Sequence, residues 1–194
     1  MKSGILDLHP LIKYVDEGDR VGKSLCGYSS SGREYGTLAN DLTVSIPEDP
    51  GFYLWGSYAK NRLWKNIYLG KAGYGRMTHL RARILEELKD ERQFLWCPFL
   101  TDEALFAKGK ECYPRMWETY KNHWKRAIAK AGASHIIWAS APEVENSQVL
   151  DIEKDLIETM NPSANLKRPV PPSSLQPVTK EVIGFFRYEI HKNR

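Results

Sequence analysis

Two short segments rich in aromatic residues, residues 52–57 and 65–70, lie on either side of a polar loop. They read Phe-Tyr-Leu-Trp-Gly-Ser and Lys-Asn-Ile-Tyr-Leu-Gly, and the stretch Ser-Ile-Pro-Glu-Asp-Pro-Gly precedes the first of them. Aromatic and β-branched residues favour strands, whereas glycine and proline at strand ends favour turns. The pattern predicts a β-hairpin whose first strand starts at Gly51. The fold must therefore contain an antiparallel sheet built around this pair.

Apolar residues at helical spacing predict helices after the hairpin. In residues 77–91, Leu80, Ile84 and Leu88 recur on one face of a helix. The remaining pattern predicts a helix over residues 115–132, a strand over 134–140, a helix over 144–160 that ends at Asn161 and Pro162, and one more strand within 181–194. Residues 6–15 are compatible with a short helix or an extended segment. The order between residues 51 and 161 is β-β-α-α-β-α, which predicts an α/β sandwich with a small sheet.

The composition limits the class of protein. The chain has 194 residues, of which 42% are hydrophobic and 27% charged, so it can bury the core of one domain. The net charge of +4 is compatible with a polyanionic partner. Cys26, Cys97 and Cys112 form no Cys-x-x-Cys pair, which argues against a zinc site or a disulfide framework. No stretch is apolar enough for a membrane span, so we expect a cytoplasmic protein without a membrane partner.

Five polar residues are distributed in sequence order over the predicted strands and helices. Tyr53 ends a Gly-Phe-Tyr triplet, Tyr68 begins a Tyr-Leu-Gly triplet, Arg83 lies on the first helix, and Glu153 and Asn165 lie in and after the last helix. This combination, over residues 46–167, resembles the GIY-YIG nuclease superfamily. The resemblance implies an α/β fold with a β-β-α-α-β-α core and a small three-stranded antiparallel sheet flanked by helices. It leaves residues 1–45 as an N-terminal extension that could read DNA and residues 168–194 as a C-terminal extension.

The resemblance also implies a chemistry. Glu153 would hold Mg²⁺, for which Mn²⁺ can substitute, and the ion would assist the departure of the 3′ oxygen. Arg83, with Arg81 as the alternative register, would contact phosphoryl oxygens. Tyr53 or Tyr68 would orient the attacking water, and Tyr53 is expected to be its base.

Because a tyrosine near its ordinary pKa of about 10 is a poor base, cations nearby are expected to favour the anion. Lys71, Arg83 or the metal ion could supply that charge. Lys71 stands where many family members have a lysine.

The chain departs from the family pattern at one informative position. Many members have a histidine one turn after the helix arginine, whereas this chain has Glu87 there. His79 lies one turn before Arg83 on the same face, so proton transfer is assigned either to a tyrosine or to His79. Asn165 is expected to orient other groups or to fix the chain after the helix.

Each of these residues also has a structural interpretation. Two tyrosines on neighbouring strands are usually packing partners, and Arg83 is spaced to pair with Glu87. A glutamate on a helix is usually solvated, although Glu153 follows Ile152 at the edge of the apolar stripe. Asp151 and Asp155 on the same helix are expected to face solvent.

Basic residues near these positions are candidates for DNA contacts. The residues expected to meet the phosphate backbone are Arg76, Arg81, Lys121, Lys125, Lys167 and Arg168. Aromatic residues recur at helical spacing within 115–132 and are assigned to the core rather than to a nucleic-acid surface.

The sequence therefore predicts a Mg²⁺-dependent DNA endonuclease, of the compact type II restriction kind, that cuts a specific double-stranded site. Its expected partners are double-stranded DNA, a second copy of the chain in a homodimer, and a cognate DNA methyltransferase. Two alternatives stay open. One is a phage or mobile-element nuclease that degrades DNA or acts as a homing enzyme, and the other is a non-catalytic DNA-binding module on the same fold.

Overall fold

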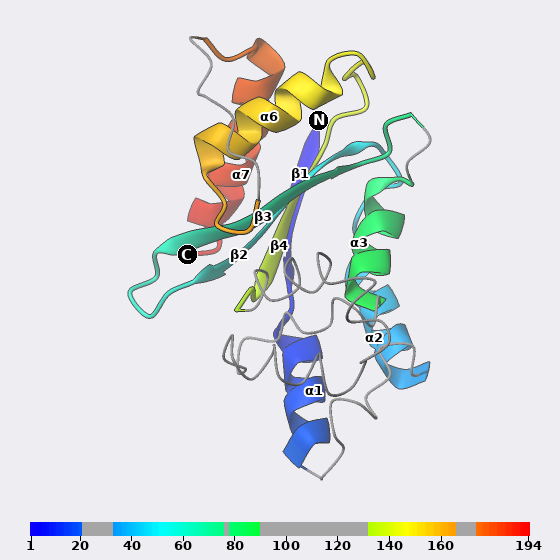
Figure 1. Ribbon diagram of the computed structural model, residues 1–194. Helices are drawn as coiled ribbons and strands as arrows, with labels where there is room; N and C mark the ends of the chain where they lie inside the picture. Colours follow the sequence, from blue (N-terminus) through cyan, green and yellow to red (C-terminus); the bar gives the residue numbers. More distant parts are fainter. Residues whose placement is uncertain (21–32, 76–77, 90–131, 166–173) are drawn as a thin grey trace, which may run out of the picture.

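The structure is a computed structural model that describes residues 1–20, 33–75, 78–89, 132–165 and 174–194 (Figure 1). Within these residues, the chain forms a four-stranded antiparallel sheet with helices on both faces. The predicted hairpin is present, since β2 (Gly51–Tyr58) pairs with β3 (Trp64–Ala72). The predicted third strand is β4 (His135–Ser140), which pairs with β2 on its other side.

A strand at residues 2–7 was not predicted from the sequence. β1 (Lys2–Asp7) pairs antiparallel with β4 and gives the sheet the order β1-β4-β2-β3. The expectation of a three-stranded sheet is therefore wrong by one strand. The strand ends where Leu8, which is completely buried, donates its backbone N–H to the carbonyl of Ser134. The N-terminal segment thus contributes directly to the sheet.

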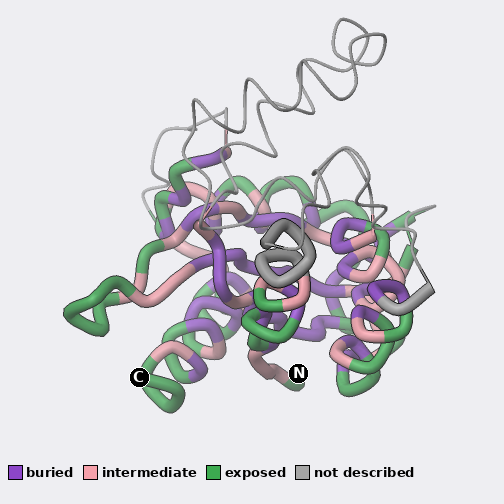
Figure 2. Tube along the Cα trace, turned by 90° about the horizontal axis from the view of Figure 1, so that it is seen from below, coloured by how far each residue is buried: buried purple, intermediate pink, exposed green. Residues whose placement is uncertain are grey.

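Helices of the described part of the chain lie on both faces of the sheet, as Figure 1 shows. α1 (His9–Arg20), α2 (Arg33–Thr43) and α3 (Leu80–Lys89) lie on one face, where Leu11, Tyr35 and Ile84 join its core. α6 (Val149–Met160) and α7 (Pro177–Lys192) lie on the other, with Ile152, Leu156 and Phe186 in a second core. Figure 2 shows these buried positions concentrated along the sheet and the helix faces that meet it.

The C-terminal strand expected within residues 181–194 is wrong, because this segment belongs to helix α7. Thr179, Val182, Ile183 and Phe186 are buried at helical spacing, and Pro177 occupies the first turn, where a missing N–H costs nothing. α6 ends as predicted, since Asn161 adopts a left-handed φ of 45° and donates its N–H to the carbonyl of Ile157.

Side-chain alternation along the strands assigns each candidate residue to a face. Tyr53 and Trp55 of β2 point into the α3-side core, whereas Phe52 and Leu54 point into the α6-side core. On β3, Leu69 faces α6, so Tyr68 and Gly70 face α3, and Lys71 lies opposite Phe52 on the α6 face.

Some predictions fall on residues outside the described ranges. They include the helix over 115–132, of which only Gly132 is described, and all three cysteines. Gly132 adopts a φ of 87°, the left-handed conformation favoured at a helix end. No helix in the described part of the chain has both the length and the apolar character needed to cross a membrane.

Candidate functional site

Tyr53, Arg83 and Glu87 meet in the core between the sheet and α3. The Tyr53 hydroxyl donates to Oε1 of Glu87 over 2.8 Å, and Nη2 of Arg83 lies 3.1 Å from the same oxygen. Glu87 is only 1% exposed, and Tyr53 is equally buried. A buried carboxylate is costly unless it is paired and hydrogen-bonded, and here both conditions are met. The first-strand tyrosine and the helix arginine of the motif are therefore joined through one buried acid.

Gly70 makes the position of the Tyr53 ring possible. Gly70 is directly opposite Tyr53 in the β2–β3 register, and a Cβ atom on Gly70 would lie 2.5 Å from both Cζ and Oη of Tyr53. The ring therefore lies across the backbone of β3, where a side chain would displace it. This contact is a physical reason for glycine in the Tyr-Leu-Gly triplet.

The surroundings of Tyr53 oppose its ionisation. Burial raises the pKa of Tyr53 well above its ordinary value, the Glu87 carboxylate and Tyr68 raise it further, and Arg83 offsets only part of the rise. Arg83 therefore favours the Tyr53 anion, as expected, but less strongly than burial and Glu87 oppose it. Lys71 lies on the opposite face of the sheet and cannot help. These surroundings favour the neutral form of Tyr53, whose hydroxyl donates to Glu87.

Arg83 stays charged and is held by two acids. Its Nη1 atom lies 2.9 Å from Oε2 of Glu86 and its Nη2 atom contacts Glu87, so the predicted pairing with Glu87 is present. Burial alone would lower the pKa of Arg83, but Tyr53 and Glu87 outweigh it and raise the pKa. The side chain is 31% exposed, so part of the guanidinium reaches the surface. A fixed, partly exposed guanidinium can bind an anionic oxygen.

Tyr68 lies beside this cluster with more access to solvent. Its ring centroid is 6.4 Å from that of Tyr53, and the two rings are tilted by 52°. Tyr68 is half-buried, in contrast to Tyr53. The packing interpretation of the two tyrosines agrees with the contact between their rings, and Tyr68 is the more exposed residue of the two.

Lys71 and Glu153 form a separate pair on the α6 face. Nζ of Lys71 lies 2.7 Å from Oε2 of Glu153, and the two side chains are 14% and 24% exposed. No contact among the described residues joins Glu153 to Tyr53, Tyr68 or Arg83. The predicted residues thus form two groups that flank the edge strand β3.

The Glu153 carboxylate fits Mg²⁺ with a minimal donor set. One partly exposed carboxylate can hold this ion when waters complete the octahedron. Within the described part of the chain, Lys71 is the group in contact with this carboxylate, and it contacts one oxygen only. The Lys71 ammonium already offsets the negative charge of Glu153, so Mg²⁺ would bind this carboxylate weakly while the pair is formed.

Asn165 binds the free edge of the sheet. Its side-chain oxygen accepts the N–H of Leu69 and its side-chain amide donates to the carbonyl of Leu69, both over 2.9 Å. The backbone N–H groups of Ser163 and Ala164 donate to Asn66 and Ile67 of the same strand. The segment after α6 therefore pairs with β3 as a further strand would. The expectation that Asn165 fixes the chain after the helix agrees with these bonds.

His79 and Arg81 have local partners. Nδ1 of His79 accepts the backbone N–H of Ala82, which satisfies a free donor at the start of α3. Arg81 lies 3.7 Å from Glu48. Both contacts are structural, and Arg83 rather than Arg81 is the arginine that meets Tyr53. Arg76, Lys121, Lys125, Lys167 and Arg168 lie outside the described residues.

Two side chains differ from their expected surroundings. Glu87 is expected to pair with Arg83, whereas its burial under Tyr53 depends on how α3 packs on the sheet. The only sequence signal was its position one turn after Arg83, where the family often has a histidine. Asp155 is 7% exposed, so its expected solvent-facing position is wrong, whereas Asp151 is exposed as predicted.

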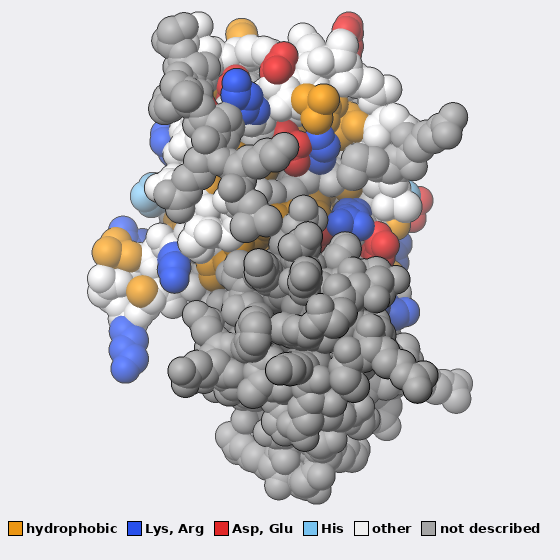
Figure 3. Space-filling model, in the orientation of Figure 1, with side chains coloured by type: hydrophobic (Ala, Val, Ile, Leu, Met, Phe, Trp, Pro, Cys, Tyr) orange, Lys and Arg blue, Asp and Glu red, His pale blue; other side chains and the backbone are white. Residues whose placement is uncertain are grey.

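On the face shown in Figure 3, acidic and basic side chains lie next to one another in several places.

Comparison with known proteins gives no match to a protein-family model, to a curated protein or to a solved structure.

Proposed function

We propose that this protein is a Mg²⁺-dependent DNA endonuclease with a GIY-YIG-like core, most similar in plan to a type II restriction endonuclease. The observation that carries the proposal is the meeting of Tyr53 and Arg83 on one buried carboxylate, with Tyr68 beside them. Both residues belong to the sequence motif, and 30 positions separate Tyr53 from Arg83. Their contact through Glu87 therefore supports the proposal.

Each side chain has a role that follows from its surroundings. Tyr53 and Glu87 hold the guanidinium of Arg83, which binds a phosphoryl oxygen and stabilises charge there. Tyr68, the more accessible phenol, orients the attacking water. Lys71 neutralises Glu153 in the free protein and turns to the phosphate when DNA binds. Glu153 would hold the Mg²⁺ ion, which supplies Lewis-acid assistance to the leaving oxygen when bound.

The core test is a digest of varied plasmid DNA. We expect cleavage with Mg²⁺ or Mn²⁺, and binding without cleavage in Ca²⁺ or EDTA. Glu153→Ala should abolish cleavage, because it removes the carboxylate proposed to hold Mg²⁺. DNA binding should persist, because the change removes a negative charge near the phosphates. Leu150→Ala on the exposed side of the same helix is the matched control, and it should cut normally. Undiminished cutting in excess EDTA, or by a folded Glu153→Ala protein, would refute the proposal.

A non-catalytic DNA-binding module is the second candidate function. Two observations favour it: the Glu153 carboxylate is paired with Lys71, and the Tyr53 hydroxyl is used by Glu87. On this alternative, the chain binds DNA in Mg²⁺ without nicking it, and Arg83→Ala weakens binding. Absence of nicking by pure, folded protein that binds DNA would favour this function over the nuclease.

A restriction role requires two strands to be cut. One active site cuts one strand, so we propose a two-fold dimer on a palindromic site, protected in the host by a cognate DNA methyltransferase. Sequencing of the ends after digestion tests this, because a restriction enzyme gives one recurring end sequence. Random ends would favour a DNA-degrading role in a phage or mobile element.

A further inference from the structure

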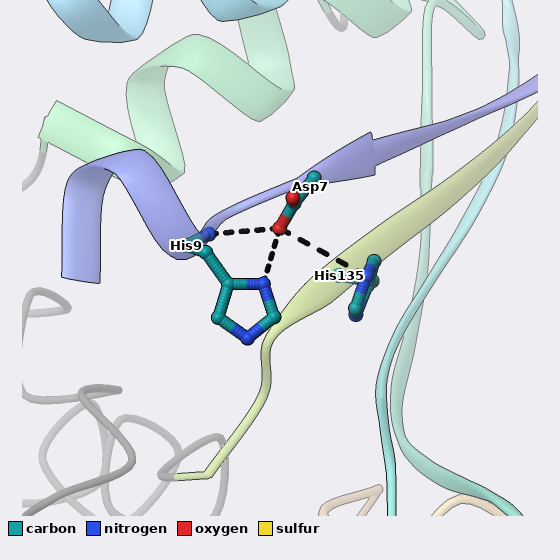
Figure 4. A group of neighbouring side chains, drawn as sticks. All are labelled: Asp7, His9 and His135. Atoms are coloured by element: carbon teal, nitrogen blue, oxygen red, sulfur yellow. Dashed lines mark hydrogen bonds and ion pairs between the residues drawn. The ribbon is translucent and has the colours of Figure 1, made fainter. Parts of the chain in front are cut away.

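Asp7, His9 and His135 lie close together where β1 runs into α1 and β4 begins, as Figure 4 shows. Asp7 ends β1, His9 begins α1, and His135 begins β4. Asp7 and His135 are direct partners in the β1–β4 register. One ligand atom from each of the three side chains can be chosen so that all lie within 4.8 Å of one another. Three separate elements thus bring two imidazoles and one carboxylate together.

The histidine on β4 is held in a defined orientation. Nδ1 of His135 lies 2.7 Å from the Ser134 hydroxyl, and the Tyr58 ring packs edge-on at a centroid distance of 5.3 Å. Tyr58 is itself fixed, since its hydroxyl donates to the carbonyl of Ile190. With Nδ1 engaged by Ser134, Nε2 is the nitrogen turned toward Asp7, at 3.9 Å from Oδ1. A neighbouring group that orients the ring in this way is typical of metal-binding histidines.

Local structure alone explains only part of this arrangement. Oδ1 of Asp7 accepts the backbone N–H of His9 over 2.9 Å and contacts Nδ1 of the same residue, as an acid at a helix start often does. That interaction needs no second histidine. His135 nevertheless points at the same oxygen from another strand, at a distance too long for a hydrogen bond. A cation between the three groups would satisfy them all.

We propose that Asp7, His9 and His135 form a binding site for one divalent transition-metal ion of the Zn²⁺, Co²⁺ or Ni²⁺ type. Imidazole nitrogens suit these ions, whereas Mg²⁺ prefers oxygen ligands only. In a tetrahedral site with bonds of about 2.0–2.1 Å, neighbouring ligand atoms lie roughly 3.3 Å apart. To reach this spacing, Nε2 of His135 would move closer to Oδ1 of Asp7, and Nδ1 of His9 would move away from it. His9 is 62% exposed and is free to make that adjustment.

The proposed metal site is separate from the proposed nuclease site. His135 pairs with Gly56, three residues along β2 from Tyr53, which is about 10 Å at 3.3 Å per residue. Asp7 is two residues from Ile5 on β1, and His135 is two residues from Ile137 on β4. Side chains two residues apart in a strand lie on the same face, and both isoleucines face the α6-side core, so Asp7 and His135 lie on the face opposite Tyr53. The ion would link β1, α1 and β4, and three protein ligands leave a fourth position for water.

The test uses the full chain after treatment with EDTA and dialysis. Co²⁺ is the spectroscopic probe and Zn²⁺ the calorimetric one. We expect one ion per chain, visible Co²⁺ absorption typical of tetrahedral coordination, and displacement of Co²⁺ by Zn²⁺. His9→Ala and His135→Gln should each weaken Zn²⁺ binding by about 10-fold or more, the scale seen even for groups that only support a ligand. Bound Zn²⁺ should also raise the melting temperature.

Two controls make the outcome specific. His191→Ala removes a histidine at the end of α7, and Glu153→Gln removes the carboxylate proposed to bind Mg²⁺; both should keep the Co²⁺ spectrum. His9 is exposed, so His9→Ala keeps the test valid if His135→Gln fails to fold. The proposal is overturned if no ion binds below about 100 μM, or if His9→Ala binds Zn²⁺ as tightly as the parental chain. Neither result depends on DNA cleavage.

Discussion

At the scale of single residues, the two tyrosine hydroxyls have different surroundings and should respond differently to removal. Tyr53→Phe leaves the buried Glu87 with one donor fewer, which costs about 1–3 kcal/mol. For a chain of this size, this lowers the melting temperature by roughly 2–4 °C per kcal/mol. Tyr68→Phe removes a hydroxyl from a half-buried residue, so its melting temperature should change less.

The cleavage rates should show the reverse order. Tyr68→Phe is expected to lose about 100-fold or more in the rate of plasmid nicking, the usual scale for a group that assists proton transfer. Tyr53→Phe should lose less once the fraction of folded protein is taken into account. His79→Ala is the control for the histidine that many family members have on this helix and this chain lacks. It should lower the nicking rate less than either tyrosine change. Parental nicking by Tyr68→Phe would remove that residue from the mechanism.

Asp155 gives a prediction about pH. Burial raises the pKa of Asp155 above its ordinary value, nearby Asp151 adds to the rise, and Lys154 opposes it. The folded protein therefore disfavours the ionised form relative to the unfolded chain, and this penalty is present above the folded-state pKa and absent below about 3.9. Asp155→Asn should therefore raise the melting temperature at pH 7.

The same comparison at several pH values tests the cause. The advantage of Asp155→Asn should shrink as pH is lowered from 7 toward 4, because the parental carboxyl becomes neutral. Asp41→Asn, at an exposed position of α2, is the matched control and should show little change at any pH. An advantage that is constant with pH would mean that packing, and not charge, is responsible.

At the scale of elements, the free edge of β3 is closed by the segment that follows α6. Asn165→Ala removes both side-chain bonds to Leu69 and should lower the free energy of unfolding by about 1–3 kcal/mol. Ser163→Ala is the matched control, because Ser163 binds β3 through its backbone only. Equal melting temperatures for the two variants would show that the Asn165 bonds do not hold the edge.

Elements with a strong local pattern could be predicted from the sequence, and those that depend on distant partners could not. The β2–β3 hairpin, α3, β4 and α6 have aromatic alternation or helical spacing with clear turn residues at their ends. α7 was assigned wrongly because Phe185, Phe186 and Tyr188 favour strands, although Pro177 and the spacing of buried residues favour a helix. β1 has no such pattern and becomes a strand only because β4 offers it an edge.

The candidate site residues also divide into those that a local motif indicates and those that only distant packing brings together. The motif indicated Tyr53, Tyr68 and Arg83, and their positions beside one another agree with it. It gave no indication that Glu87 is buried between two of them, since that depends on packing across 34 residues. Asp7, His9 and His135 could not be grouped either, because 126 positions separate the two histidines and only the β1–β4 register brings them together.

At the scale of the whole molecule, β1 should be essential for folding rather than an addition to a finished core. Deleting residues 1–8 removes the partner of β4 together with the buried side chains of Leu6 and Leu8. Loss of large apolar core side chains costs about 2–5 kcal/mol each, comparable with the total stability of a domain. We expect the truncated chain to be insoluble or to lose its cooperative thermal transition. Lys2→Ala, at an exposed position on the same strand, should melt like the parental chain.

β1 also has a consequence for how the chain is made. Its residues are synthesised well before those of its partner strand β4, which begins at residue 135, and Ser3 finally bonds to Glu189 of α7. At about 5–20 residues per second, the ribosome needs on the order of ten seconds to reach β4. Throughout that time β1 has no strand to pair with. A nascent chain of this protein should therefore depend on chaperones more than one whose first strand pairs with its second.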